Sequence, residues 1–445
     1  MTKDLTVGSP FRQIVGFAFP LLLGILFQQF YTITDTIIVG KLLGVKQLAG
    51  VGSTGALSFL VLGFCNGVCS GFAIPIAQKF GAGQPGELRR YMANALWTAA
   101  AFALVLTTTV CLCCPAILRL MNTPDDIFQY AYRYILVIFL GIPATFLYNI
   151  LAGILRSLGD SRSPVLFLAL SSVMNIALDL LFIAVLHTDV VGPALATVLS
   201  QAVSGCVCLF YMRRKYPILH LQSGEARPSL PHIRRLCYLG IPMGLQYSVT
   251  AIGSSIIQRA TNSFGSSVVA GVTAAQRLNG LLSCPIEALG GTMAPYAGQN
   301  VGAGKYDRLG KGAAAATLCG VVSSAVMLGV VLLWGKNLVA LFLDAPDAEV
   351  IACAYRFLLT AVAGYTLLTL VNVLRLSIQG MGFSVLAICS GIMELLARSS
   401  VGLLLVPRMG FGGLCLGHPS AWLLADLFLI PAFFLCKRRV GLKKV

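Results

Sequence analysis

The most constraining feature of this sequence is a succession of long apolar stretches that recurs from one end of the chain to the other. Each stretch can cross the hydrocarbon core of a bilayer, which is about 30 Å thick and takes about 20 helical residues. Of the 445 residues, 57% are hydrophobic and 11% are charged, and no long polar domain interrupts the apolar stretches. The sequence therefore predicts an integral membrane protein.

The apolar stretches are continuous and do not alternate, which predicts helices and excludes barrel strands, because a helix satisfies its own backbone groups in lipid. We expect an all-α polytopic fold with twelve transmembrane helices. The six spans expected in the first half are 14–40, 48–76, 92–118, 130–154, 164–186 and 192–212. Those expected in the second half are 236–261, 268–298, 312–334, 353–377, 385–406 and 412–436.

The charged residues sort by side of the membrane. The formal net charge is +16, and most of the 32 Lys and Arg residues fall in segments that share one side when the N-terminus is placed inside. The positive-inside rule then places both termini in the cytoplasm of a multi-pass protein of the cell membrane. The charge excess therefore needs no nucleic-acid partner.

The two halves of the chain resemble each other at a nearly constant offset. "FRQIVGFAFP" (11–20) resembles "IRRLCYLGIP" (233–242), and "QKFGAGQPGELRR" (78–90) resembles "QNVGAGKYDRLGK" (299–311). The same offset places Gly159 of "RSLGDSRSP" on Gly380 of "SIQGMGFSV". Since each half has an even number of expected spans, both halves enter the membrane in the same orientation, as parallel repeats do.

This duplication predicts three parts, an N-terminal six-helix lobe (1–212), a cytoplasmic linker (213–235) and a C-terminal six-helix lobe (236–445). The linker is long enough to let two lobes move against each other, which suits transport. No catalytic motif is found, so we expect neither an enzyme nor a cofactor. An intramembrane enzyme would need a nucleophile or metal constellation that the sequence lacks.

Acids inside apolar spans need a reason, because each costs about 2.5 to 3.5 kcal/mol at a helix centre. Asp35 shares a helix face with Gln28 and Tyr31. Either it is a carboxylate solvated near the outer interface or it has a role in the transport site. Asp179 forms a polar stripe with Ser171 and Asn175 at steps of four residues.

Thr197 and Gln201 repeat this four-residue step in the next expected span. Carboxylates, an amide and a hydroxyl make the oxygen set that Na⁺ accepts, and two nearby acids in a low dielectric also favour holding a proton. The stripe therefore suits either cation. Packing between helices is the alternative explanation.

Three further acids lie in expected spans of the second half. Glu394 lies four residues before Arg398, which predicts an ion pair within one helix. Glu287 either recognises a cationic substrate or pairs with Arg259 or Arg277. Asp426 stays undecided.

The order of several motifs resembles the MATE (multidrug and toxic compound extrusion) family of secondary transporters, in its bacterial branches. These motifs are Asp35 in the first span, the two "GAG" turns, "LRSLGDSRSP" followed by "NIALD", and "GPALATVLSQ". The resemblance implies a V-shaped, two-lobe transporter that exchanges H⁺ or Na⁺ for small, amphipathic, often cationic organic compounds. By motif position it implies a cation-coupling site, or a possible Na⁺ site, at Asp35, Asn175, Asp179 and Thr197.

We further expect Gln28, Tyr31 and Glu287 to contact the substrate, and a monomer in the lipid bilayer. One alternative is a flippase for lipid-linked oligosaccharides or other lipids on the same architecture, although such a protein more often lines its cavity with Lys and Arg. A second alternative is the major facilitator fold. Proteins of that fold have a characteristic loop pattern between the second and third spans, and the stretch "KFGAGQPGELRR" of this sequence fits that pattern poorly.

Overall fold

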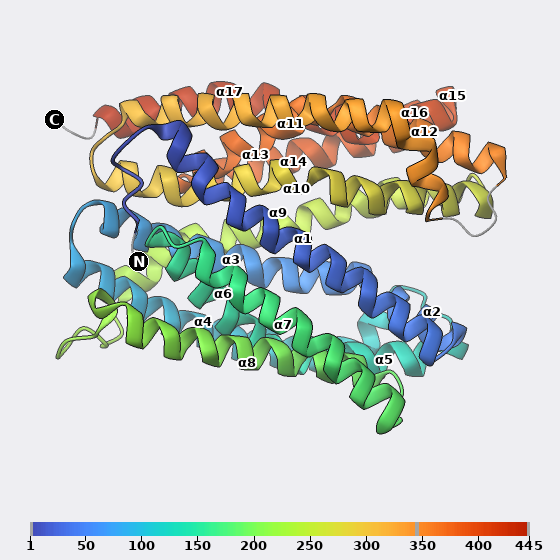
Figure 1. Cartoon of the computed structure of the whole chain (residues 1–445), viewed down its shortest axis with the longest axis horizontal. Coiled ribbons are helices and arrows are strands. Elements are labelled where there is room, and N and C mark those ends of the chain that lie inside the picture. The colour runs from blue at the N-terminus through green and yellow to red at the C-terminus, as the bar shows by residue number, and fades with distance from the viewer. Residues whose placement is uncertain (1–2, 343–346, 443–445) are drawn as a thin grey trace. The chain divides into compact units, whose positions relative to one another are not determined.

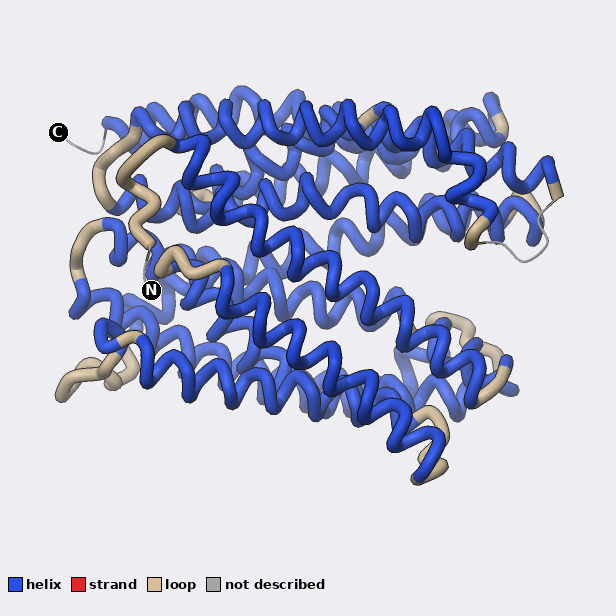
Figure 2. The backbone as a smooth tube through the Cα atoms, in the orientation of Figure 1, coloured by secondary structure: helices blue, strands red, loops and turns tan. Residues whose placement is uncertain are grey.

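The computed structural model describes residues 3–342 and 347–442, and this part of the chain forms helices and loops without strands (Figures 1 and 2). The first half contains α1 (Pro10–Leu42), α2 (Val45–Ser53), α3 (Gly55–Gly81), α4 (Pro85–Leu120), α5 (Asp125–Leu140), α6 (Ile142–Ser157), α7 (Arg162–Leu180), η1 (Leu181–Val185), α8 (Val191–Lys215) and η2 (Pro217–Leu219). The second half contains α9 (Leu230–Asn262), α10 (Ser266–Gly302), α11 (Asp307–Ala340), α12 (Ala348–Ala363), α13 (Tyr365–Gly380), α14 (Ser384–Ser400), η3 (Val401–Leu405), α15 (Val406–Met409), α16 (Phe411–Cys415) and α17 (Gly417–Leu442).

Among the described residues, eight helical segments are long and apolar enough to cross a membrane, and two bent helix pairs raise the number to ten. The all-α membrane fold is therefore confirmed, and eight to ten of the twelve expected spans meet this test. The two further spans, 236–261 and 268–298, lie in α9 and α10, which have 33 and 37 residues. Polar residues such as Gln246 and Glu287 interrupt the apolar character of these two helices, so their crossing stays a prediction.

The helices group into two compact units. Unit 1 is built on Leu23–Gly244, and unit 2 on Leu5–Leu22 together with the chain from Leu245 onward. The division therefore falls inside α1 and α9, shortly after Pro20 and Pro242, and not in the loop that joins the halves. The boundaries 1–212, 213–235 and 236–445 stay a prediction for the functional lobes.

The duplication is visible in the irregular parts of the helices. The pair α5 and α6 bends by 45° and the pair α12 and α13 by 47°, at Gly141 and Gly364. Both α7 and α14 end in five-residue π-helical segments, η1 and η3. Such segments are rare, so their recurrence at corresponding places supports two structural repeats.

Each "GAG" turn ends its helix in the same way. Gly83 and Gly304 have φ values of +64° and +68°, in the left-handed region that favours glycine. In the first turn, the N–H of Gly83 donates to the Phe80 carbonyl and the next N–H donates to the Lys79 carbonyl. In the second turn, the N–H of Gly304 donates to the Val301 carbonyl and the next N–H donates to the Asn300 carbonyl. This is the Schellman arrangement, so the glycines cap the two helices.

One position of the repeat was assigned wrongly from the sequence. Gly159 has φ +84° and caps α6 with the same pair of bonds as the "GAG" turns. Its structural counterpart is Gly382, which has φ +94°. The N–H of Gly382 donates to the Gln379 carbonyl, and the N–H of Phe383 donates to the Ile378 carbonyl. Gly380, which the constant offset aligned with Gly159, is the last residue of α13. A two-residue shift inside a loop does not change the apolar pattern, which explains the error.

Small residues let α3 and the first part of α9 approach closely within unit 1. A Cβ added to Gly71 would lie 2.5 Å from the Cα of Gly240, and one added to Gly67 would lie 2.5 Å from the Met243 carbonyl oxygen. Glycines at helix crossings allow this backbone contact and the van der Waals packing that stabilises helices in membranes.

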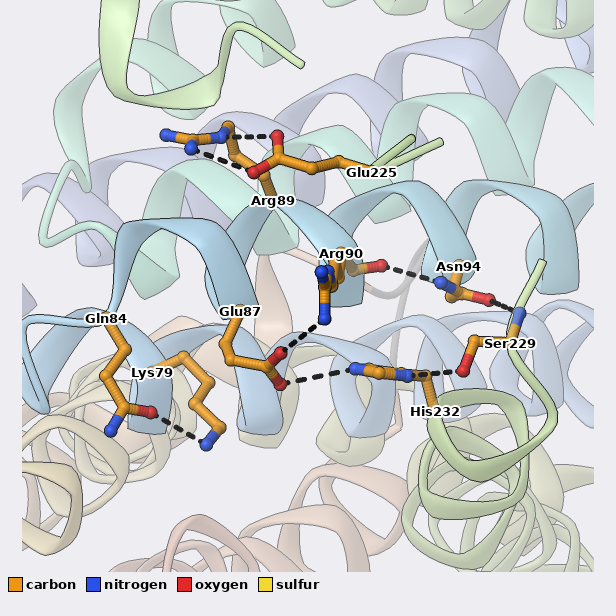
Figure 3. A network of polar contacts seen from close by, with 9 residues as sticks. All are labelled: Lys79, Gln84, Glu87, Arg89, Arg90, Asn94, Glu225, Ser229 and His232. Atoms are coloured by element: carbon orange, nitrogen blue, oxygen red, sulfur yellow. Dashed lines mark hydrogen bonds and ion pairs between the residues drawn. The ribbon is translucent and has the colours of Figure 1, made fainter. Parts of the chain in front are cut away.

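The linker is bound to α4 within unit 1 (Figure 3). Arg89 donates two hydrogen bonds to the Glu225 carboxylate, at 2.6 and 2.9 Å, and Ser229 donates its backbone N–H to Asn94 at 2.8 Å. His232 lies 3.3 Å from the Glu87 carboxylate. The hydrogen bonds from Arg89 hold the pKa of Glu225 below its ordinary value. The segment that we expected to join two moving lobes is therefore bound to unit 1.

The segment before α1 is bound in a corresponding way within unit 2. Leu5 donates its backbone N–H to the Gln299 side chain at 2.8 Å, and Lys305 donates to the Thr6 carbonyl at 2.9 Å. Arg308 donates to the carbonyl of Gly8 at 2.9 Å. These contacts place the start of α1 beside the start of α11.

Candidate cation-coupling site

Three helices of unit 1 bring the predicted coupling residues together. Helix α1 supplies Asp35, α7 supplies Asn175 and Asp179, and α8 supplies Thr197. Helices α7 and α8 are neighbours in the chain and pack side by side (Figure 1). The four-residue step along α7 puts Asn175 and Asp179 on one face, where they are 1% and 0% exposed.

The Asn175 amide joins two of these helices. In the orientation that satisfies both ends of the amide, its nitrogen donates to Asp179 Oδ2 at 3.2 Å and its oxygen accepts from the Thr197 backbone N–H at 3.2 Å. This orientation is assigned from the hydrogen-bond network. On the other side of the site, the Tyr31 side chain lies near that of Thr197.

The carboxyl groups of Asp35 and Asp179 lie within hydrogen-bonding reach of each other. One oxygen of each, Oδ1, is buried without a partner in the described chain. A buried acceptor without a donor carries a desolvation penalty of about 1 to 3 kcal/mol. Two adjacent carboxylates also repel each other when both are charged. A proton or a small cation relieves both costs.

A polar cavity of about 80 Å³ adjoins the site. This volume holds several water molecules, since each takes up about 10 to 15 Å³ of such a cavity. The polar residues that line the cavity are Gln28, Tyr31, Tyr148, Asn149, Ser171, Ser172, Asn175, Ser200 and Gln201. Gln28 and Tyr31, both expected to contact substrate, therefore lie beside Asn175.

Sequence reasoning missed the contribution of α6 to this cavity. Asn149 lines it, and Thr145 donates to the Gln201 side chain at 2.7 Å, which orients that amide. Thr145 and Asn149 are four residues apart, the same spacing that drew attention to α7. The same spacing in α6 could have predicted that this helix also lines the cavity.

The chemistry of the site suits H⁺ or Na⁺. Its donors are two carboxyl groups, an amide and hydroxyl oxygens, which are hard ligands. The described residues hold no cluster of three or more His, Cys, Asp or Glu side chains that could bind a metal ion. These oxygens fit a monovalent cation better than a transition metal.

Glu287 belongs to unit 2, whereas the four coupling residues belong to unit 1. It is exposed and accepts a hydrogen bond from Ser283 at 2.8 Å. In the described part of the chain it forms no ion pair with Arg259 or Arg277. Substrate recognition by Glu287 stays a prediction.

Glu394 forms the ion pair expected from the sequence. Arg398, four residues later on α14, lies 3.2 Å from one carboxylate oxygen. Arg375 on α13 binds the other oxygen, a contact that the sequence did not suggest. All three side chains are buried. The carboxylate of Asp426 is also buried, and both its oxygens have no partner among the described residues.

A comparison with protein families identifies the chain. The MatE family model matches residues 20–181 and 242–398, one segment in each half. The chain is a MATE transporter. The expectation drawn from the motifs is thereby confirmed, and members of this family are transporters and not enzymes.

Curated bacterial relatives resemble this MATE transporter over most of its length. It is 30% identical to the "Probable multidrug resistance protein YpnP" of Bacillus subtilis, over 78% of this chain and 77% of that protein. It is 23% identical to the "Multidrug export protein MepA" of Staphylococcus haemolyticus, over 86% and 85%. It is 22% identical to an "FAD transporter" of Shewanella oneidensis, over 67% and 66%.

Solved structures share the fold of this MATE transporter. One, described as the outward-facing conformation of a multidrug resistance MATE family transporter, has a TM-score of 0.91 at 22% identity and covers 100% of this chain and 99% of its own. Another, of a MATE protein in complex with MaL6, has a TM-score of 0.90 at 22% identity and covers 100% of both chains. This likeness confirms the fold alone.

Proposed function

We propose that this MATE transporter is a cation-coupled antiporter that exports small, amphipathic, often cationic organic compounds across the cell membrane. The coupling ion is H⁺ or Na⁺, held at Asp35, Asn175, Asp179 and Thr197. The protein acts as a monomer with both termini in the cytoplasm.

The observation that carries this proposal is the contact between the carboxyl groups of Asp35 and Asp179, each with a buried oxygen that has no partner. Two adjacent buried carboxylates repel each other, which costs free energy when no cation is bound. Binding of a cation therefore changes the stability of the surrounding helices. A difference in preference between the empty and the loaded site is what coupling requires.

The inward movement of one cation supplies enough free energy for export. One charge crossing 100 mV is worth about 2.3 kcal/mol, which offsets a concentration gradient of more than tenfold for a neutral solute. Alternating access then follows if the loaded and the empty site favour openings to opposite sides.

The substrate class rests on other observations. Gln28 and Tyr31 line the polar cavity next to the coupling site and offer hydrogen bonds. Glu287 is exposed in unit 2 and has no ion-pair partner in the described chain, so it is available to a cationic compound. The printed names of YpnP and MepA, which describe multidrug resistance and multidrug export, agree with this class.

Dye efflux from proteoliposomes tests the proposal. An imposed pH gradient and an imposed Na⁺ gradient are applied separately to wild type, Asp35→Asn and Asp179→Asn. We expect one gradient to drive efflux in wild type and both variants to lose it. The matched control is Asp126→Asn, which removes the same charge from an exposed residue at the start of α5.

Gradient-driven efflux that survives in both site variants would contradict the assignment of the coupling site. Wild-type protein that moves no dye under either gradient would contradict the antiport proposal and direct attention to a lipid cargo.

A further inference from the structure

An apolar groove of about 440 Å³ lies within unit 2, between the first part of α1, the middle of α10 and α11. Phe11, Phe19 and Leu22 line it from α1, and Leu318 and Val322 line it from α11. Phe11, Phe19, Leu318 and Val322 are 47 to 60% exposed. Exposed apolar side chains of this size in a membrane helix belong in hydrocarbon, so the groove is open to a lipid-like occupant.

The groove has the length of one bilayer leaflet. From Phe11 to Leu22 the axis of α1 rises about 16 Å, at about 1.5 Å per residue. Half of the hydrocarbon core is about 15 Å thick. One acyl chain that enters from the leaflet on the side of the N-terminus therefore fits along α1.

Two exposed cationic side chains lie at the end of unit 2 where α1 and α11 begin. Arg12 is in the first turn of α1, next to Phe11, and Lys311 is near the start of α11. The two helix starts lie at the same end of unit 2, because Arg308 on α11 donates to the Gly8 carbonyl just before α1. Lys311 lies seven residues, two helical turns, before Leu318 and therefore on the same face of α11.

These two cations are free to bind a ligand. Within the described residues neither Arg12 nor Lys311 forms an ion pair. Lys305 and Arg308, at the same end, instead donate to the backbone carbonyls of Thr6 and Gly8. Two unpaired positive charges therefore lie at the same end of unit 2 as the starts of the helices that line the apolar groove.

We propose that this groove is a binding site for an anionic phospholipid, with one acyl chain between α1, α10 and α11 and the phosphate headgroup at Arg12 and Lys311. Acyl chains are surrounded by hydrocarbon whether bound or free, so packing alone discriminates weakly between lipids. The headgroup supplies the selectivity, because basic residues at a membrane surface attract anionic lipids. The proposal is independent of the coupling site and of the exported compound.

Native mass spectrometry of the purified full-length protein tests the headgroup contact. Phosphatidylglycerol and phosphatidylcholine with identical acyl chains are added at equal concentrations. Each basic residue near the headgroup is worth about fivefold in affinity. We therefore expect wild type to bind phosphatidylglycerol at least tenfold more tightly, and Arg12→Gln combined with Lys311→Gln to abolish this preference. Lys336→Gln, which removes a charge at the opposite end of α11, should leave it unchanged.

A second pair of variants tests the acyl-chain slot. Val322→Trp fills the groove, whereas Leu332→Trp enlarges a side chain elsewhere on the same helix, and both positions are 57% exposed. Neither change should prevent folding. We expect Val322→Trp to reduce phosphatidylglycerol binding at least fivefold and Leu332→Trp to leave it at the wild-type level.

Three outcomes would overturn the proposal. Equal binding of the two lipids by wild type would indicate only non-selective annular lipid. Full phosphatidylglycerol binding by the Arg12 and Lys311 double variant would exclude the headgroup contact. Full binding by Val322→Trp would exclude the groove as the acyl-chain site.

Discussion

Replacing Glu394 with Gln is expected to destabilise unit 2 strongly. Glu394 binds Arg375 with one carboxylate oxygen and Arg398 with the other. The residues Glu394, Arg375 and Arg398 are 3%, 9% and 4% exposed. Glutamine keeps the size of the side chain and removes its charge, so two buried guanidinium groups lose their counter-charge.

The size of the effect follows from this burial. Removing one partner of a buried ion pair costs about 3 to 5 kcal/mol, because the remaining charge is left without compensation. For a cooperative unit of roughly 200 residues, each kcal/mol lowers the melting temperature by about 2 to 4 °C. We therefore expect a fall on the order of 10 °C.

Thermal unfolding of the detergent-solubilised protein, followed by intrinsic fluorescence, measures this shift. Glu349→Gln is the matched control, because it removes an acid from an exposed position near the start of α12. Its melting temperature should stay within 1 to 2 °C of wild type, as expected for an exposed charge worth less than about 1 kcal/mol.

A melting temperature of Glu394→Gln that equals wild type would refute the reasoning. The combined change of Glu394, Arg375 and Arg398 to Leu, Met and Met gives a second check. Replacement of a whole buried ionic cluster by apolar side chains is often neutral or stabilising. The triple variant should therefore be more stable than Glu394→Gln, and an equally large loss would show that packing, not charge, causes the effect.

Three further predictions concern the other sites. Asn175→Ala should reduce gradient-driven dye efflux at least tenfold in proteoliposomes, because the amide joins α7 to α8; an unchanged rate would exclude this role. Arg89 holds the pKa of Glu225 below its ordinary value of 4.5, so the pair stabilises the bound linker above that pH and is lost as the pH falls through the lower, folded value. Cleavage of the linker by an acid-active protease should therefore accelerate in that window, while Glu225→Gln should be cleaved quickly at every pH. Gly382→Ala should lower the melting temperature by a few degrees, because a side chain at φ +94° costs about 1 to 2 kcal/mol. Its control is Gly329→Ala, a helical position with open space around it, which should show no loss.

The helical fold and its duplication could be read from the sequence because both depend on local patterns. Continuous apolar stretches specify helices in lipid, and the "GAG" turns recur as identical Schellman caps at Gly83 and Gly304. The alignment of the two halves fails only in a loop. The constant offset pairs Gly159 with Gly380, whereas the structure pairs it with Gly382.

The candidate site was predicted in part. The stripe on α7 was visible because Asn175 and Asp179 are separated by four residues on one helix. The cavity wall from α6 was missed, although Thr145 and Asn149 have the same spacing. A polar stripe shows which face of a helix is polar and does not show which other helix it meets.

Four features follow from the amino-acid sequence alone: the membrane-embedded helices, the two repeats, the polar stripe of α7 and the pairing of Glu394 with Arg398. Each is set by spacing along one segment or by similarity between segments. Four other features depend on the packing of separate segments. The carboxyl group of Asp35 lies beside that of Asp179, and Arg375 forms an ion pair with Glu394. The linker binds α4, and Glu287 belongs to the other unit. These contacts depend on how separate helices pack and rotate against one another, and periodicity within one helix carries no record of that arrangement.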